Sequence, residues 1–401
     1  LRDVYKRQYF TIAPPAGITT EGGRNNTHIN ATALTLQNNP AGEGLWLAHG
    51  MGNQDPAQQW NNWSDPDYWK VELLAGDVLS VYVNTPESAL DPYVELHNAQ
   101  GNYLTADDYA GANNDAFISR QLIEQTGTYY LKVGKYYYDA AAGSYELLVD
   151  VAREIDMEYD PHYQNGSLSG ANALHFAADQ HYQVSSVAGA IMAIESGSTF
   201  DYDVFALGRF NVGNTIELTT TLPSTSSLIP LVTLFNAAGT PITDAHWNPA
   251  DGIFSATLTQ DGDYYAQVER GYQYNGHTYV LTNAGMYWTD AEAYAEALGG
   301  HLVTINNAAE QQWLADTFAS VNPWIGMSDS NNTDEWHWSD GAATSYTHWE
   351  SSQPSTWGNY NYGYLNPNGW WYAGENQWNY RALSEFESMG TVPAATDQYV
   401  T

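Results

Sequence analysis

Oxygen-bearing side chains gather around an Asp-x-Asp motif near the start of the chain. Asp65 and Asp67 form this motif, Asn25 precedes it, and Asp107 and Asp108 form an acidic pair after it. Ca²⁺ is a hard cation that takes six to eight oxygen ligands, so these five residues are candidate calcium ligands. The alternative is that the carboxylates cap turns by accepting hydrogen bonds from backbone N–H groups.

Motifs that would indicate catalysis are missing from the sequence. It holds no His-Glu-x-x-His, no Gly-x-Ser-x-Gly, no phosphate-binding loop and no dinucleotide fingerprint. The 46 acidic residues are too many for any one pair of carboxylates to indicate a glycosidase. We therefore predict that the chain is not an enzyme.

The charge balance narrows the classes of partner. Twelve basic residues against 46 acidic ones give a formal net charge of −34, which repels phosphate backbones and anionic lipid headgroups. We expect no nucleic-acid partner, and divalent cations or neutral glycans suit this surface better. Without any cysteine there are no disulfides, and no apolar run is long enough for a transmembrane segment. The oligomeric state cannot be predicted from these residues.

Three ordered matches at nearly one offset indicate an internal repeat. The matched pairs are 65–68 with 201–204, 92–101 with 230–239, and 127–133 with 262–268. Apolar residues alternate within each copy, which is typical of antiparallel β-sandwiches. We predict one sandwich over residues 9–152 and a second over 160–270. Residues 1–8 hold three of the basic residues and are read as non-native sequence.

At these residues each copy resembles the bacterial pre-peptidase C-terminal domain, a secreted β-sandwich. Some members of that family bind Ca²⁺ through an N-terminal acidic or Asn segment and the Asp-x-Asp turn. The second copy has Thr243-Asp244-Ala245 in place of the acidic pair Asp107–Asp108. The resemblance therefore implies Ca²⁺ in the first β-sandwich, which it would stabilise more than the second.

A helical period appears only after residue 270. Thr289 to Glu292 reads as a capping box that opens one helix, and Asn307 with Glu310 opens another. Short tryptophan-rich strands and long loops follow. This combination predicts an α+β domain over residues 276–388. The fold class is thus mainly β, with two antiparallel sandwiches followed by an α+β domain.

The α+β region resembles a C-type lectin-like domain. Its ordered landmarks are 279–281, 288–292, 298–305, 324–327, 336–341, 346–349, 353–354 and 385–387. A disulfide usual in that family is replaced by Ala295 and Ser384, so we expect Trp324, Trp336, Trp338 and Trp349 to stabilise the domain by packing.

Sugar-binding members of that family hold Ca²⁺ with a Glu-Pro-Asn or Gln-Pro-Asp loop and a downstream Trp-Asn-Asp. Here the corresponding segments are Gln353-Pro354-Ser355 and Trp371-Tyr372-Ala373, which lack carboxylates. The resemblance implies ligand binding by the long loops, without a Ca²⁺ bridge and with aromatic stacking instead. The candidate ligand-binding residues are Gln353, Ser355, Trp357, Tyr360, Tyr362, Trp370, Glu375 and Asn376.

Together these features predict a non-catalytic, extracellular recognition module of a bacterial secreted or surface protein that binds a glycan or a protein surface. One alternative is an accessory region of a secreted hydrolase whose catalytic domain lies outside this fragment. Another is a structural spacer of an adhesin. Residues 389–401 are expected to be a linker or the start of a further domain.

Overall fold

The structure is a computed structural model of the 401-residue chain. It describes residues 17–23, 25–39, 44–54, 66–86, 88–136, 141–179, 182–192, 200–223, 226–245, 252–330, 333, 335–355, 358–387 and 398–400. The chain divides into two compact units, residues 1–38 with 44–154 and residues 39–43 with 155–401. Within the described ranges, no helix combines the length and apolar character needed to cross a membrane.

The first unit is a β-sandwich, here called the first sandwich. One sheet contains β1 (Ile18–Thr20), β4 (Leu45–Gln54), β11 (Gly143–Ala152), β6 (Val78–Asn84) and β9 (Ala116–Leu122) in that order, with β3 (Gln37–Asn38) beside β4. The other contains β2 (Thr32–Ala33), β5 (Asp67–Leu73), β10 (Gly127–Lys135), β7 (Pro92–His97) and β8 (Tyr103–Asp107). Short 3₁₀ turns cover His28–Asn30 and Ala112–Asn114.

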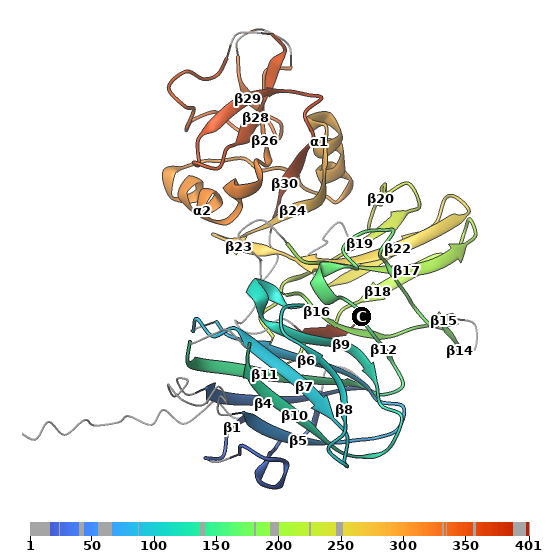
Figure 1. Ribbon diagram of the computed structural model, residues 1–401. Coiled ribbons are helices and arrows are strands. Elements are labelled where there is room, and N and C mark those ends of the chain that lie inside the picture. The colour runs from blue at the N-terminus through green and yellow to red at the C-terminus, as the bar shows by residue number, and fades with distance from the viewer. Residues whose placement is uncertain are drawn as a thin grey trace, which may run out of the picture. The chain divides into compact units, whose positions relative to one another are not determined.

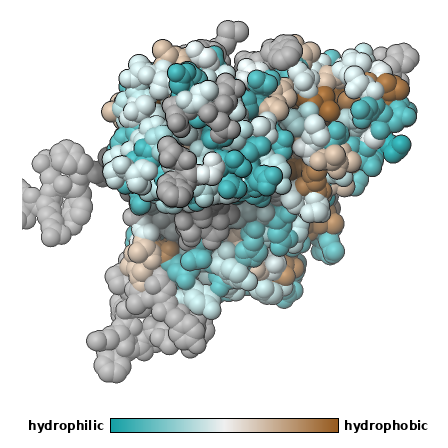
Figure 2. Space-filling view, turned by 90° about the horizontal axis from the view of Figure 1, so that it is seen from above, coloured by the Kyte–Doolittle hydropathy of each residue, from teal (hydrophilic) through white to brown (hydrophobic). Residues whose placement is uncertain are grey.

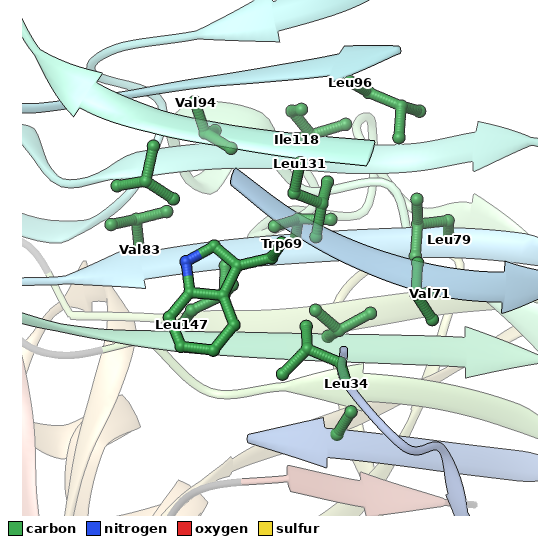
Figure 3. Close-up of a cluster of buried hydrophobic side chains, with 14 of the residues drawn as sticks. Leu34, Trp69, Val71, Leu79, Val83, Val94, Leu96, Ile118, Leu131 and Leu147 are labelled. Atoms are coloured by element: carbon green, nitrogen blue, oxygen red, sulfur yellow. The ribbon is translucent and has the colours of Figure 1, made fainter. Parts of the chain in front are cut away.

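Alternate side chains of the two sheets form the core of the first sandwich. Along β5, Asp67, Trp69, Val71 and Leu73 are buried, and the residues between them are more exposed, as a two-residue period requires. Trp69 is fully buried and lies in the middle of this core, beside Leu147 and Leu131 (Figure 3). The predicted sandwich is therefore confirmed as a fold.

The second unit begins with another sandwich, here called the second sandwich. Its main sheet contains β13 (Asn172–Ala173), β17 (Tyr202–Phe210), β22 (Gly262–Arg270), β19 (Pro230–Asn236) and β20 (Pro241–Ile242) in that order. The remaining strands are β18 (Thr215–Thr219) with β21 (Ile253–Thr257), β14 (Ala177–Asp179) with β15 (Tyr182–Val184), and β12 (Asp156–Met157) with β16 (Val187–Ala190) and β31 (Gln398–Val400). A 3₁₀ turn covers Pro161–Tyr163.

The strand order confirms the internal repeat. The sheet β2-β5-β10-β7-β8 of the first sandwich corresponds strand by strand to β13-β17-β22-β19-β20 of the second. In both sheets the first pair is parallel and the other pairs are antiparallel. The duplication therefore extends from sequence to topology.

The end of the described chain returns to the second sandwich. The backbone of β31 pairs antiparallel with β16, with Tyr399 opposite Gly189. In the first sandwich β11 pairs with β4 in the same way, with Tyr145 opposite Gly52. Of residues 389–401, predicted as a linker or the start of a further domain, the structure describes 398–400, which form a strand on this sandwich. The α+β domain lies in sequence between β22 and this strand.

Deleting residues 398–401 should lower the free energy of unfolding of the second sandwich by about 1–3 kcal/mol, because each backbone hydrogen bond contributes roughly 1 kcal/mol net. Hydrogen exchange at β16 in the full-length and truncated chains measures the loss of protection. Deletion of Thr401 alone is the control. Equal exchange in all three chains would show that β31 adds no stability.

The α+β domain, here called the C-terminal domain, covers residues 272–387. Its sheet contains β23 (Tyr272–Tyr274), β24 (His277–Met286), β30 (Tyr380–Glu387), β26 (Trp324–Ser328), β28 (Tyr360–Leu365) and β29 (Trp371–Glu375), with β25 (His301–Leu302) beside β30 and β27 (His337–Trp338) beside β26. Its helices are α1 (Trp288–Ala297) and α2 (Ala308–Phe318), and a 3₁₀ turn covers Ala319–Val321. Figure 1 shows both helices near β24 and β30, and β28 and β29 at the other end of the domain.

The tryptophan packing expected for this domain is present. Trp324 and Trp338 are buried, and Trp336 and Trp349 are partly buried against the domain's main core. From sequence alone, residues 278–281 could either end the second sandwich or begin this domain. They lie in β24, which pairs with β23 and β30 of the same domain.

Candidate functional site

The loop that begins at Gln353 folds back onto the domain. The Gln353 side-chain Oε1 accepts hydrogen bonds from the backbone N–H groups of Ser355 (3.1 Å) and Ala373 (3.0 Å). Strand β29 fixes Ala373, so it also fixes the glutamine. The Gln353 carbonyl oxygen therefore holds the loop to β29, and the two bonds occupy the oxygen that a metal would need.

Asn376 supports helix α1. Its Oδ1 accepts a hydrogen bond from the backbone N–H of Thr289 (3.0 Å), and its Nδ2 lies 3.2 Å from the Thr289 hydroxyl. Its backbone carbonyl accepts from the N–H of Trp288. These bonds satisfy the free N–H groups at the start of the helix, so the carboxamide is engaged in folding. Glu375, predicted beside it, is partly exposed at the end of β29.

Three aromatic rings line up at the surface near β29, and we call Tyr346, His348 and Trp370 the aromatic platform. The rings of His348 and Trp370 are stacked at 4.2 Å with an interplanar angle of 1°, and that of Tyr346 lies 6.2 Å from His348 at 9°. Trp370 is 40% exposed. Burial lowers the pKa of His348, which favours a neutral ring at pH 7. Because the His348 and Trp370 rings stack face to face, the exposed Trp370 is the ring of this platform that presents apolar surface to water.

Only Trp370 of this platform was among the predicted ligand residues. Tyr346 and His348 are two residues apart, the spacing that places side chains on one face where a chain is extended, and this spacing could have identified them. Tyr360 and Tyr362 are partly buried, 5.7 Å from the Trp378 ring and 4.9 Å from the Trp288 ring respectively. Trp357 lies outside the described residues.

A carboxylate lies two residues after His348 in the sequence. The Glu350 side chain accepts hydrogen bonds from the hydroxyls of Ser351 and Ser352, both 2.5 Å long, and these bonds lower its pKa to about 2. The backbone N–H of Glu350 donates to Trp371 in β29. An ionised acceptor thus lies on the same loop as His348.

The candidate calcium ligands of the first sandwich have other partners. Asp67 accepts hydrogen bonds from Gln54 Nε2 (2.7 Å) and the Tyr145 hydroxyl (2.8 Å). Asp107 Oδ2 accepts from three backbone N–H groups, those of Tyr109, Ala110 and Phe117.

The other candidates in this sandwich are less engaged. Asn25 is buried, and its backbone carbonyl accepts from Tyr68. Burial and the neighbouring Asp107 charge raise the pKa of Asp108. Asp65 lies outside the described residues.

The second sandwich brings three carboxylates together, and we call Asp160, Asp201 and Asp203 the acid cluster. One carboxylate oxygen from each lies within 4.8 Å of the others, and all three side chains are buried. Within the described ranges this is the one group of three or more metal-binding side chains that are this close. Asp201 and Asp203 correspond to Asp65 and Asp67 in the repeat, but the part played by Asp160 was not predicted from sequence.

The electrostatics of the acid cluster follow from burial among like charges. Desolvation, and then the charge of Asp203, raise the pKa values of Asp160 and Asp201. Glu158 is buried beside them, and the same two causes raise its pKa. Asp201 Oδ2 accepts from the backbone N–H of Met192 at 2.5 Å, and Glu158 Oε1 accepts from Ala190 at 2.6 Å. Carboxylates this close favour either shared protons or a bound cation.

The C-terminal domain matches known proteins. The family model described as "Lectin C-type domain" matches residues 284–382. A perlucin-like protein of Mytilus galloprovincialis is 30% identical over 113 residues, which are 27% of this chain and 69% of that protein. The chain belongs to the C-type lectin domain family. We therefore call the C-terminal domain the lectin domain from here on.

Other relatives match over the same part of the chain. Lectin BRA-3 of Megabalanus rosa is 31% identical over 96 residues, and C-type lectin domain family 10 member A of Rattus norvegicus is 34% identical over 87. The chain spans 59% of the first and 28% of the second, and the matches cover 23% and 21% of this chain. The mouse scavenger receptor C-type lectin carbohydrate-recognition domain is 28% identical, with a TM-score of 0.29, over 30% of this chain and 96% of that domain.

Proposed function

We propose that the lectin domain recognises a carbohydrate by stacking it on the aromatic platform, without a bridging Ca²⁺. The observation that carries this proposal is the flat stack of His348 and the exposed Trp370 in a domain of the C-type lectin family. Sugar rings present apolar C–H faces that suit aromatic faces, and Glu350 on the same loop supplies an acceptor for hydroxyl groups.

The surface around β28 and β29 suits a polar ligand. Figure 2 views the molecule from that end; apart from residues drawn in grey, its surface is mainly teal and white, with brown hydrophobic patches confined to the right side of the view. A protein partner that binds through a large hydrophobic patch is therefore less favoured than a glycan at this face.

The loop chemistry supports recognition without a calcium bridge. The oxygen of Gln353 is bonded to two backbone N–H groups, and Ser355 and Ala373 contribute no carboxylate. Such a bridge needs side-chain oxygens that bind the metal and the sugar hydroxyls together. Glycan binding should therefore survive chelation of Ca²⁺. A glycan array with millimolar Ca²⁺, repeated with chelator, measures this, and loss of binding in chelator would contradict it.

Replacing Trp370 by alanine should weaken glycan binding about tenfold or more, because a lost stacking contact of roughly 1.4 kcal/mol is a factor of ten in affinity. Array signals followed by calorimetry on the best glycan measure the change. Tyr287 is also an exposed aromatic of the lectin domain, so Tyr287→Ala is the matched control. Equal losses in both variants would show that the platform is not the binding surface.

We further propose that the chain comes from a bacterial secreted or surface protein, with both sandwiches of the pre-peptidase C-terminal type. The excess of acidic residues and the duplicated sandwich support this. An accessory region of a secreted hydrolase and a spacer of an adhesin are the alternatives, and the full reading frame distinguishes them. Calcium binding at Asn25, Asp65, Asp67, Asp107 and Asp108 stays a prediction, tested by melting the chain with Ca²⁺ and with chelator.

A further inference from the structure

A row of tyrosines crosses the sheet of the lectin domain. Tyr364 in β28 lies opposite Tyr372 in β29, and their ring centroids are 5.8 Å apart. The Tyr380 ring, from β30, lies 4.9 Å from that of Tyr364. All three side chains are half-buried, so each keeps part of its ring at the surface. We call Tyr372, Tyr364 and Tyr380 the tyrosine strip.

Two tryptophans hold the rings of the strip in position. The buried Trp324 of β26 is paired with Tyr364, and its ring lies 6.1 Å from that of Tyr364 and 4.9 Å from that of Tyr380. The Trp378 ring lies 5.8 Å from each of the same two tyrosines. Gly374 permits this position, because a Cβ there would lie 2.8 Å from the Trp378 ring. Rings fixed before a ligand arrives lose little freedom when it binds.

The tyrosine strip continues into the aromatic platform on one face of the sheet. Trp371 is buried in the main core of the domain, and in an extended chain its two neighbours point to the opposite face. Those neighbours are Trp370 of the platform and Tyr372 of the strip, which are exposed and half-buried respectively. The Asn366 N–H donates to the Trp370 carbonyl (2.9 Å), which extends the pairing of β28 with β29 as far as Trp370. Trp370 and Tyr372 therefore belong to one surface.

The segment that carries His348 lies along the other edge of β29. Trp349 forms a parallel bridge with Trp371, and their rings pack 5.7 Å apart in the core. His348, the residue before Trp349, stacks on Trp370 instead. The order across this face is thus the His348 segment, β29, β28, β26 and β30, and Figure 1 shows β29, β28 and β26 in succession. With about 4.8 Å between neighbouring strands, the face extends roughly 19 Å from His348 to Tyr380.

The charge of the lectin domain favours a neutral ligand for this face. Residues 272–387 contain one lysine or arginine, Arg381, and its guanidinium lies over the Phe200 ring of the second unit, 5.6 Å from the ring centroid. Glu350, two residues after His348, adds a carboxylate. A carboxylated or sulfated polysaccharide would therefore be repelled, with no lysine or second arginine to offset the repulsion. Neutral sugars suit the face, because their C–H faces stack on rings and their hydroxyls bond to tyrosine hydroxyls.

We propose that the aromatic platform and the tyrosine strip form one extended site, which binds an internal stretch of a neutral polysaccharide with several sugar rings in contact at once. This inference rests on the proposed function for the class of ligand and adds its length and its charge. The platform alone offers one exposed ring, which suits one sugar. A row of rings across the sheet contacts successive sugars of a chain, so affinity increases with chain length until the chain spans the row.

Calorimetry of the full wild-type chain with oligosaccharides of increasing length tests the extended site without any substitution. The probes are β-1,4-linked glucose, β-1,4-linked mannose and β-1,3-linked glucose, each from the dimer to the hexamer, and galacturonic acid oligomers of the same lengths. We expect the affinity for at least one neutral series to rise about tenfold or more from dimer to hexamer, and the galacturonic acid oligomers not to bind. Affinity that stops rising at the dimer, absence of binding in all three neutral series, or binding of the acidic oligomers would overturn the inference.

Substitutions in the strip locate the added contacts. Tyr372→Ala should weaken hexamer binding about tenfold and leave dimer binding unchanged, because the dimer needs only the platform. Tyr372→Phe keeps the ring and should retain most of the hexamer affinity, which separates stacking from damage to the fold. Tyr109→Ala removes an exposed tyrosine of the first sandwich and is the control.

The extended site and the platform fail in different ways. If Trp370→Ala weakens both dimer and hexamer while Tyr372→Ala binds like the wild-type chain, the platform stands and the extended site is overturned. If Trp370→Ala leaves both affinities unchanged, the platform is not the binding surface, and the extended site built on it is overturned as well.

Discussion

Replacing Trp371 by alanine is expected to lower the free energy of unfolding of the lectin domain by about 3–5 kcal/mol, the usual cost of removing a buried tryptophan. Trp371 is 0% exposed, and its ring lies 5.3 Å from that of Trp338 and 5.7 Å from that of Trp349. Its indole N–H donates to Gln311 Oε1 at 2.6 Å. Truncation thus opens a large cavity and leaves a buried acceptor on α2 without its donor.

Urea unfolding of the full chain, followed by tryptophan fluorescence, measures this loss. The neighbouring residue supplies the matched control, because Trp370 is 40% exposed and its truncation should change stability by no more than about 0.5 kcal/mol. Substitutions of the two adjacent tryptophans should therefore have different effects: Trp371→Ala should lower stability, and Trp370→Ala should weaken glycan binding. Equal losses of stability would show that Trp371 is not a central packing residue of this domain.

Replacing Glu269 by glutamine should stabilise the second unit at alkaline pH by about 3–5 kcal/mol, at roughly 1.4 kcal/mol per unit of pKa shift. Burial raises the pKa of Glu269 from the ordinary 4.5 to about 8. One hydrogen bond from Gln267 Nε2, 2.9 Å long, acts in the opposite direction and lowers it. Glu269 lies opposite Tyr202 in the β17–β22 pair. Ionising Glu269 places a buried negative charge in the second sandwich, and the hydrogen bond from Gln267 only partly stabilises that charge.

The direction in which pH changes the stability follows from how many protons the folded and unfolded chains bind. Below about pH 4.5 the glutamate is protonated in both the folded and the unfolded chain, so it costs no stability. Between there and pH 8 only the folded chain keeps the proton, and stability falls as pH rises; above pH 8 the loss is complete. The difference between Glu269→Gln and wild type should therefore be small at pH 5 and largest at pH 9.

Urea unfolding at pH 5, 7 and 9 measures that difference, because the other buried acids are common to both chains. Glu217→Gln changes an exposed glutamate of the same sandwich and is the control. A difference between Glu269→Gln and wild type that does not grow with pH would mean that the pKa of Glu269 is not raised in the folded chain.

The local patterns that predicted the fold are those in which neighbours in sequence determine the structure. Asn307 caps α2 as predicted, since its Oδ1 accepts from the N–H groups of Ala309 and Glu310, both at 3.0 Å. The expected capping box at Thr289 does not form, because α1 begins at Trp288 and Asn376 bonds to the Thr289 N–H. Asn376, which is 87 residues away in sequence, thus bonds to the N–H group at the start of α1, and no pattern among neighbouring residues predicts such a contact.

The candidate metal ligands also divide into residues that the sequence pattern predicted and residues that only the tertiary structure brings together. The repeat aligns Asp65 and Asp67 with Asp201 and Asp203, and sequence alone favoured the first pair because the acidic pair Asp107–Asp108 follows it. In the structure Asp67 and Asp107 are bonded to protein donors. The acid cluster forms instead where Asp160 reaches Asp201 and Asp203, across about forty residues of sequence.

The sequence by itself determined the features that depend on period and order: two duplicated sandwiches and an α+β domain after them. The resemblance of that domain to C-type lectin-like domains then implied the tryptophans of its core. Alternation and helical period act over a few residues, so they can be read along the chain. The tertiary structure decided which polar groups converge. It brought Tyr346, His348 and Trp370 to one surface. It also placed the Asn376 side chain at the start of α1, and Asp160 beside Asp201 and Asp203. Such convergence depends on how separate segments pack, because a side chain binds whatever the fold brings within reach.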